Sequence, residues 1–222
     1  LACLHSYELM NFDDNEILEF FNKRSDWLAK HHESGRLTNH QALIALCLVL
    51  SSKLLGTKKW DEAIDLRINR VLSWQDEEGW FHEYEGCDPG YNTLTISFLS
   101  WIYKLRPSPK IRSSLERAVN FVSKFIHPDG TYGGEYGSRN TYNFFPHGFE
   151  LVAKWYNKAT VINDKFAKGL QAGLIPCYND DHIIGHHTWN YLLTYIDYVD
   201  KRIDNYSTIS KEREWFPNAK IL

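Results

Sequence analysis

The chain has 222 residues, enough for one large domain with a substantial core, and its 43% hydrophobic and 24% charged residues are ordinary for a globular protein. The formal net charge of -3 argues against a nucleic-acid-binding protein or one held on a membrane by basic charge. No long apolar run predicts a transmembrane helix. The first residues, Leu1-Ala2-Cys3-Leu4, contain neither an initiator Met nor a signal-peptide pattern, so we expect a processed chain or a fragment of a longer one.

About eight helices are predicted, and they alternate between two kinds. One kind is amphipathic, with Ile111, Leu115 and Ala118 at helical spacing on one face of a helix. The other is apolar almost all round, as in residues 42–50, and such a helix is buried on most sides. The predicted pairs are 15–33 with 39–55, 58–74 with 92–105, 109–127 with 141–157, and 160–173 with 188–204, followed by an irregular tail over 205–222.

An Asn stands at the start of each apolar helix, at an interval of about fifty residues. The four are Asn39, Asn92, Asn140 and Asn190. Asn is a favoured N-cap, because its side chain accepts hydrogen bonds from the free amides of the first helical turn. We therefore expect each Asn to cap its helix.

This helical repeat predicts an all-α fold, an alpha/alpha toroid in two concentric layers. The apolar helices form the inner layer, and the amphipathic helices shield them from solvent. Four pairs form only an arc, so we expect an incomplete toroid that occupies residues 1–222 as a single domain. An open helical solenoid is the alternative with the same local packing.

Two long loops have the same design. Residues 79–86 and 130–137 each carry a Glu-Tyr pair a few residues after a Gly-aromatic turn. Structured loops of this length are often functional, so they indicate one ligand-binding face, and the aromatic content of 15% fits either sugar stacking or a bulky core. The candidate substrate-binding residues are Trp80, Glu83, Glu135, Tyr136, Arg139, Asn140 and His147.

Two short motifs open successive apolar helices. The first is Thr38-Asn39-His40-Gln41-Ala42-Leu43 and the second is Glu85-Gly86-Cys87-Asp88-Pro89-Gly90-Tyr91-Asn92-Thr93-Leu94. Together they resemble the helical domain of the heparinase II/III-like polysaccharide lyases and related alginate lyases. The resemblance covers residues 36–105 in motif detail and is architectural beyond them. It implies that Asn39 and His40 hold and neutralise the substrate carboxylate, and that Tyr91 transfers the proton.

The implied reaction is β-elimination on a uronic-acid polysaccharide. A base takes the proton at C5, the 4-linked oxygen leaves, and a neutralised carboxylate stabilises the developing enolate. A Tyr has an ordinary pKa near 10, so Tyr91 as the base needs a cation such as Arg139 or a protonated His beside it. The chain departs from the family in two ways: Asn92 stands where a His often follows the Tyr, and no run of strands matches the family's β-sandwich domain.

Other interpretations of these residues remain open. Glu83 and Glu135, or Glu85, would serve as the acid and base of a glycoside hydrolase or uronate epimerase, or would hold the loops by bonding to their amides. Asn39 would instead be a helix cap, and His40 a structural residue of the first helical turn. In place of a catalytic role, Tyr91 would pack its ring beneath the loop. A third class is a non-catalytic polysaccharide-binding or assembly module.

No metal site or cofactor is predicted. The spacing of His182 and His186 suits a metal, but only Asp180 and Asp181 lie near them. The four Cys lack zinc-site spacing and do not form a convincing disulfide framework. The expected partner is an acidic polysaccharide or oligosaccharide. The sequence leaves the compartment open, periplasmic or cytoplasmic if the chain is bacterial, and leaves the oligomeric state open.

Overall fold

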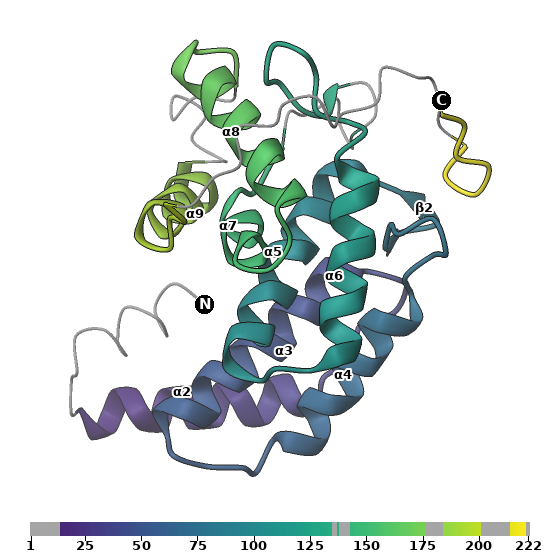
Figure 1. Ribbon diagram of the computed structural model, residues 1–222. Coiled ribbons are helices and arrows are strands. Elements are labelled where there is room, and N and C mark those ends of the chain that lie inside the picture. Colours follow the sequence, from purple (N-terminus) through teal and green to yellow (C-terminus); the bar gives the residue numbers. More distant parts are fainter. Residues whose placement is uncertain (1–13, 135–136, 138–142, 176–183, 201–213, 221–222) are drawn as a thin grey trace.

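The computed structural model describes residues 14–134, 137, 143–175, 184–200 and 214–220 (Figure 1). These residues are mostly helical, at 62% helix, which confirms that part of the prediction. The helices are α2 (Asn15–Lys30), α3 (Thr38–Leu54), α4 (Asp61–Ser73), α5 (Pro89–Leu105), α6 (Pro109–Val122), α7 (His147–Ala153), α8 (Lys158–Gln171) and α9 (Ile184–Ile196). A small antiparallel hairpin, β1 (His82–Glu83) with β2 (Gly86–Cys87), lies between α4 and α5.

The buried helices pack side by side in chain order. Helix α3 contacts α5, α5 contacts α7, and α7 contacts α9. The amphipathic helices lie against this row, with α4 on α3, α6 on α5 and α8 on α7, and they also contact one another. The described helices therefore pack as a row of buried helices with amphipathic helices along it, and we call these the inner row and the outer row.

The predicted pairing holds for the first pair, since α2 packs against α3, and differs for the other three. Three buried helices, α3, α5 and α7, pack extensively against the amphipathic helix that follows each of them, whereas the prediction joined each amphipathic helix to the buried helix after it. The reason is loop length. Short connections at 55–60, 106–108 and 154–157 keep consecutive helices adjacent and antiparallel, while the long loops lead to the next repeat.

The prediction that the repeated Asn residues are N-caps is wrong for the three that the structure describes. Helix α3 begins at Thr38, before Asn39, and α5 is capped by Asp88, which accepts from the backbone N–H of Tyr91 at 2.8 Å. Asn190 lies well inside α9. All three are buried and bond to neighbouring segments instead. Asn140 lies outside the described residues.

Two helices differ most from their predicted extent. Helix α7 begins at His147 and not near residue 141, because Pro146 directly before it has a fixed φ and no N–H, which suits a helix start. Helix α9 ends at Ile196. It is also less buried than an inner helix of the row, since Leu192, Tyr195 and Ile196 are exposed. As the last described member of the row, it has an inner neighbour on one side only.

The core runs continuously through the repeats. Most of the aromatic residues belong to it, for example Trp60, Phe81 and Trp101, so the aromatic content serves bulk packing more than ligand contact. Among the described residues, no helix is long and apolar enough to cross a membrane.

Candidate functional site

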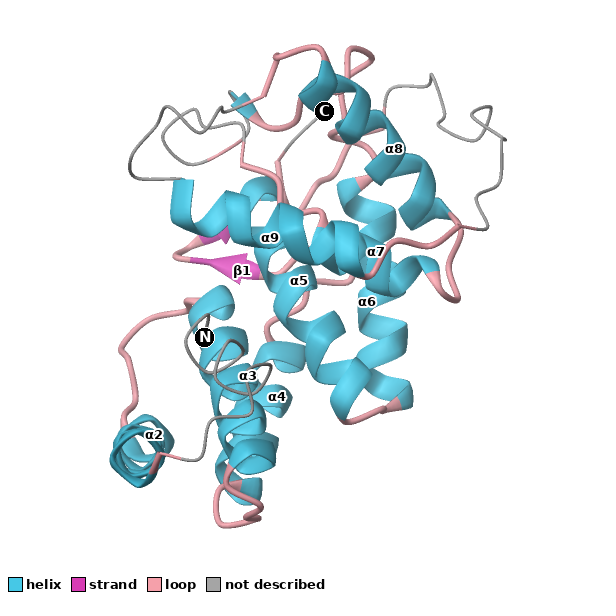
Figure 2. Ribbon diagram, turned by 90° about the vertical axis from the view of Figure 1, so that its left-hand side faces the viewer, coloured by secondary structure: helices cyan, strands magenta, loops and turns pink. Residues whose placement is uncertain are grey.

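The long loop between α4 and α5 folds back onto the start of α3, the helix of the preceding repeat (Figure 2). Leu37 and Glu83 form an isolated antiparallel bridge, and the N–H of Tyr84 donates to the carbonyl of Arg36 at 2.8 Å. The hydroxyl of Thr38 donates to the carbonyl of His82. The hairpin is therefore fixed to the first turn of α3, where the sequence placed Asn39 and His40.

A buried carboxylate stands at this junction. Glu83 accepts a hydrogen bond from the backbone N–H of Asn39 at 2.6 Å and another from its side-chain nitrogen Nδ2 at 2.8 Å. The two residues are only 3% and 5% exposed. Burial raises the pKa of Glu83 to about 7, although the hydrogen bonds from Asn39 act to lower it. Glu83 thus satisfies an orphan amide of α3 from the next repeat.

His40 projects into a more open environment than Asn39. Its ring nitrogen Nδ1 lies 2.9 Å from a carboxylate oxygen of Glu33, and both side chains are partly exposed. The residue therefore remains accessible at the edge of the α3 start, while the side-chain nitrogen of Asn39 is engaged with Glu83.

Tyr91 has an aromatic neighbour that the sequence did not single out. The ring of Tyr84 meets it edge-on, with 6.4 Å between ring centroids, and is 57% exposed. Tyr84 has φ of 56°, a left-handed conformation that is unfavourable for a side chain and is imposed by the tight hairpin turn. The two rings form an aromatic pair at the hairpin. The repeated Glu-Tyr of the two loops was the available signal for it.

Trp80 does not offer a face for sugar stacking. It is 2% exposed, its ring lies 4.4 Å from that of His82, and its Nε1 donates to Glu78 at 2.9 Å. We therefore correct its expected role: Trp80 is a buried residue that packs against His82 of the hairpin. Burial lowers the pKa of the neighbouring His82, with Arg36 adding to the effect.

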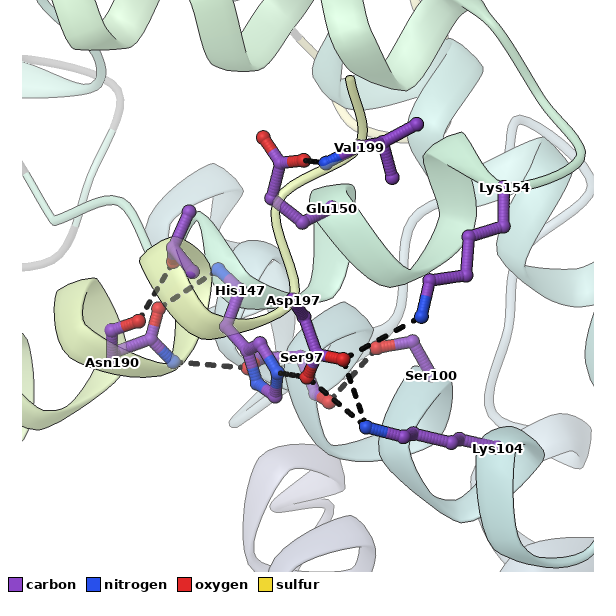
Figure 3. Close-up of polar contacts among 10 residues, drawn as sticks. Ser97, Ser100, Lys104, His147, Glu150, Lys154, Asn190, Asp197 and Val199 are labelled. Carbon is purple, nitrogen blue, oxygen red and sulfur yellow. Dashed lines mark hydrogen bonds and ion pairs between the residues drawn. The ribbon is translucent and has the colours of Figure 1, made fainter. Parts of the chain in front are cut away.

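His147 belongs to a second polar cluster that ties α9 to α5 and α7 (Figure 3). It is buried, and its Nε2 lies 2.9 Å from Asp197, which also accepts from Lys104 at 2.9 Å. Asn190 accepts from the backbone N–H of His147 at 3.0 Å and donates to Ser97 at 3.1 Å.

Burial lowers the pKa of His147, although the contact with Asp197 acts to raise it. Burial acts to raise the pKa of Asp197, but the hydrogen bonds from His147 and Lys104 together hold it well below its usual range. With its ring buried against Trp101 and Asp197, His147 is placed to hold helices together rather than to meet a substrate.

The second long loop repeats the arrangement of the first where the structure describes it. The hydroxyl of Tyr132 donates to the carbonyl of Pro89 at 3.0 Å, and the N–H of Phe145 donates to the hydroxyl of Thr93 at 3.1 Å. This loop therefore lies on the start of α5, as the first lies on the start of α3. The candidates Glu135, Tyr136, Arg139 and Asn140, together with His182, lie outside the described residues.

Metal ligation finds no support in the described part of the chain, where no group of three or more His, Cys, Asp or Glu could hold an ion. A groove lies between α4 and α6, and none of the candidate residues lines it. Its lining residues are Leu72, Pro109, Lys110, Ser113, Ser114 and Arg117. No protein-family model, curated protein or solved structure matches the chain. The resemblance to polysaccharide lyases therefore stays a prediction from the two sequence motifs.

Proposed function

We propose that this chain is an incomplete alpha/alpha toroid that binds an acidic, uronic-acid polysaccharide and cleaves it by β-elimination. The observation that carries the proposal is that one hairpin contacts a residue of each lyase-like motif. The hairpin of one repeat lies on the start of α3, so that Asn39 contacts Glu83 and the adjacent Tyr84 contacts Tyr91.

Repetition of this arrangement supports the proposed toroid. Inner helices α3, α5 and α7 pack in sequence, and each of the two long loops returns to the start of the preceding inner helix. A constant rotation between repeats turns such a row into an arc with its long loops on one rim. Ligand sites of repeat folds are commonly on the face that carries the loops.

Carboxylate recognition is favoured at the start of α3. Helix N-termini attract anions through their free amides, and here the chain's own Glu83 occupies the amides of Asn39. A uronate would take over the Nδ2 donor of Asn39 when Glu83 is protonated, which the raised pKa of about 7 allows near neutral pH. His40, at the exposed edge, would supply a second donor.

The aromatic pair would hold the sugar ring and supply the base. The exposed ring of Tyr84 offers an apolar face for stacking. Tyr91, as phenolate, would take the C5 proton, a C4–C5 double bond would form as the C4–O bond breaks, and the departing oxygen would take the proton back from Tyr91. Arg139, outside the described residues, remains the proposed cation for the phenolate.

The test is ultraviolet absorbance over time with a panel of uronic-acid polysaccharides, because the unsaturated product absorbs. Loss of the acid–base group typically costs about 100-fold or more in rate. We expect absorbance to rise with the parent chain, and we expect the rate of this rise to be lower by that factor in Tyr91→Phe. Tyr195→Phe, on an exposed side chain of α9, is the matched control and should keep the parent rate. A flat trace with polysaccharide still bound would instead establish a binding module.

A glycoside hydrolase is the second candidate, and the environment of Glu83 favours it. A general acid must be protonated near the working pH, and burial raises the pKa of Glu83 to about 7. A hydrolase would release reducing ends without new absorbance, and Glu83→Gln would abolish that release while Tyr91→Phe would not.

A further inference from the structure

Residues 214–220 contact the long loop that carries the hairpin, although Asn218 and Glu78 are 140 positions apart in the sequence. The ring of Phe216 is buried against Phe121 and Phe125 of α6 and just beyond it, at centroid distances of 5.1 and 6.1 Å. Glu214 forms an ion pair with Lys124. This short segment is therefore anchored to the end of α6 by an aromatic and an ionic contact.

Glu78 anchors the other end of the segment. Its two carboxylate oxygens accept from successive backbone amides, that of Asn218 at 2.9 Å and that of Ala219 at 3.0 Å. The side-chain nitrogen of Asn218 donates to Asp76 at 3.0 Å. A carboxylate that accepts from two adjacent N–H groups forms charge-assisted hydrogen bonds, which are stronger than neutral ones.

The same carboxylate also leads to the candidate site. Glu78 accepts from the indole N–H of Trp80 at 2.9 Å, and that indole ring packs on His82. His82 precedes Glu83, and its carbonyl accepts from Thr38 at the start of α3. A continuous set of contacts thus connects residues 218–219 with the hairpin.

We propose that residues 214–220 form a strap that holds the hairpin of the candidate site in place, and that Glu78 is the positioning residue through which the strap acts. Glu78 acts through Trp80 and not on a ligand. With the strap docked, the Glu78 carboxylate has a fixed orientation set by three N–H donors from two segments. Without the strap, the Glu78 carboxylate loses two of its three donors and becomes mobile. The indole N–H of Trp80 then has no fixed acceptor, and the hairpin is held less firmly. The effect on ligand binding rests on the proposed function; the effect on the hairpin does not.

Hydrogen exchange measures the hairpin directly. The amides of Phe81, His82 and Tyr84 all donate hydrogen bonds within the loop and to its neighbours. The hydrogen bonds to the Glu78 carboxylate are charge-assisted, so we expect these amides to exchange about 10-fold faster in Glu78→Gln and in a chain that ends at residue 213. Amides of α8 should be unchanged. A synthetic peptide of residues 214–220 should restore slow exchange to the shortened chain.

Glu77→Gln is the matched control, because this neighbouring carboxylate is exposed and its contact with Asn218 is long, at 3.4 Å. It should leave hairpin exchange at the parent rate. Ala219→Pro removes a backbone N–H that donates to Glu78 and keeps Phe216, so it tests the strap even where the shortened chain fails to fold. Hairpin amides that exchange at the parent rate in Glu78→Gln and Ala219→Pro would overturn the proposal.

Binding to a uronic-acid polysaccharide separates the two proposals. We expect Glu78→Gln to bind such a polysaccharide about 10-fold more weakly than the parent. Faster hairpin exchange in a protein that binds no polysaccharide would support the strap and refute the proposed function. Unchanged hairpin exchange in Glu78→Gln, with a parent protein that does bind the polysaccharide, would refute the strap and support the proposed function.

Discussion

The carboxylate of Glu83 lies 2.6 Å from the backbone nitrogen of Asn39 and 2.8 Å from its side-chain nitrogen, although the two residues are 44 positions apart. One repeat therefore completes the first helical turn of the repeat before it. Tyr132 and Pro89 make a corresponding contact one repeat later. The loops that form the candidate site are thus also the connections that hold neighbouring repeats together.

Glu83 should make stability depend on pH. Burial raises its pKa from 4.5 to about 7, so between these values the folded chain binds a proton more tightly than the unfolded chain does. The stabilisation from this proton is complete below pH 4.5 and is lost as the pH rises to 7, by about 3 kcal/mol at 1.36 kcal/mol per pKa unit. Denaturant unfolding across this range should show the decrease in the parent and not in Glu83→Gln. An equal decrease in both proteins would contradict the assignment.

Arg67 should be one of the most sensitive positions for stability. Its buried guanidinium donates to the side chain of Gln41 at 2.7 Å and to the carbonyl of Leu28 at 2.6 Å, which joins α4 to α3 and α2. Arg67→Ala leaves buried acceptors without donors and should lower the free energy of unfolding by about 3 kcal/mol. Arg106→Ala is the control: its partners Asp61 and Asp65 are exposed, and its loss should cost about 1 kcal/mol or less. Equal losses in the two variants would refute the role of Arg67.

Gly148 should tolerate no side chain. A Cβ there would meet backbone atoms of Ser97 at 2.6 and 2.7 Å, since α7 crosses α5 at this point. Because backbone cannot yield as a flexible side chain does, Gly148→Ala should destabilise the fold by about 3 kcal/mol in thermal or denaturant unfolding. A Cβ at Gly185, in α9, would meet nothing within 4 Å, so Gly185→Ala should be neutral or up to about 1 kcal/mol stabilising. Equal stability of the two variants would show that α7 can shift away from α5.

Asp197 should hold α9 against the rest of the fold. It accepts from Lys104 of α5 and contacts His147 of α7, so Asp197→Asn should lower the free energy of unfolding by about 2 kcal/mol and speed exchange of α9 amides. Its lowered pKa means that this contribution is present above its ordinary pKa of 3.8 and is lost as the pH falls through the folded-state pKa. Asp65→Asn, at an exposed pair, should change stability by about 0.5 kcal/mol at most. Unaltered α9 exchange in Asp197→Asn would show that other contacts hold the helix.

The helices were largely predictable, and their exact limits were not. An apolar run such as residues 42–50 indicates its own burial, because a helix without a polar face is buried on most sides. The start of α7 was missed because the effect of Pro146 outweighs the helical pattern around it. The Asn caps were wrong because capping preference is a local rule. Asn39 is buried and bonds to Glu83 of the next repeat, and Asn92 is buried and bonds to the backbone of Phe81 and Asp88.

By itself, the sequence determined the helical class, the alternation of buried and amphipathic helices, and the fifty-residue interval at which loops meet helix starts. These properties depend on hydrophobic spacing that each segment carries alone. Tertiary structure decided that Glu83 meets Asn39, that Trp80 is buried, and that Asn218 reaches Glu78 from 140 residues away. Such contacts depend on where the chain returns after a long loop. The raised pKa of Glu83 is likewise a result of its burial at such a contact, and not of its residue type.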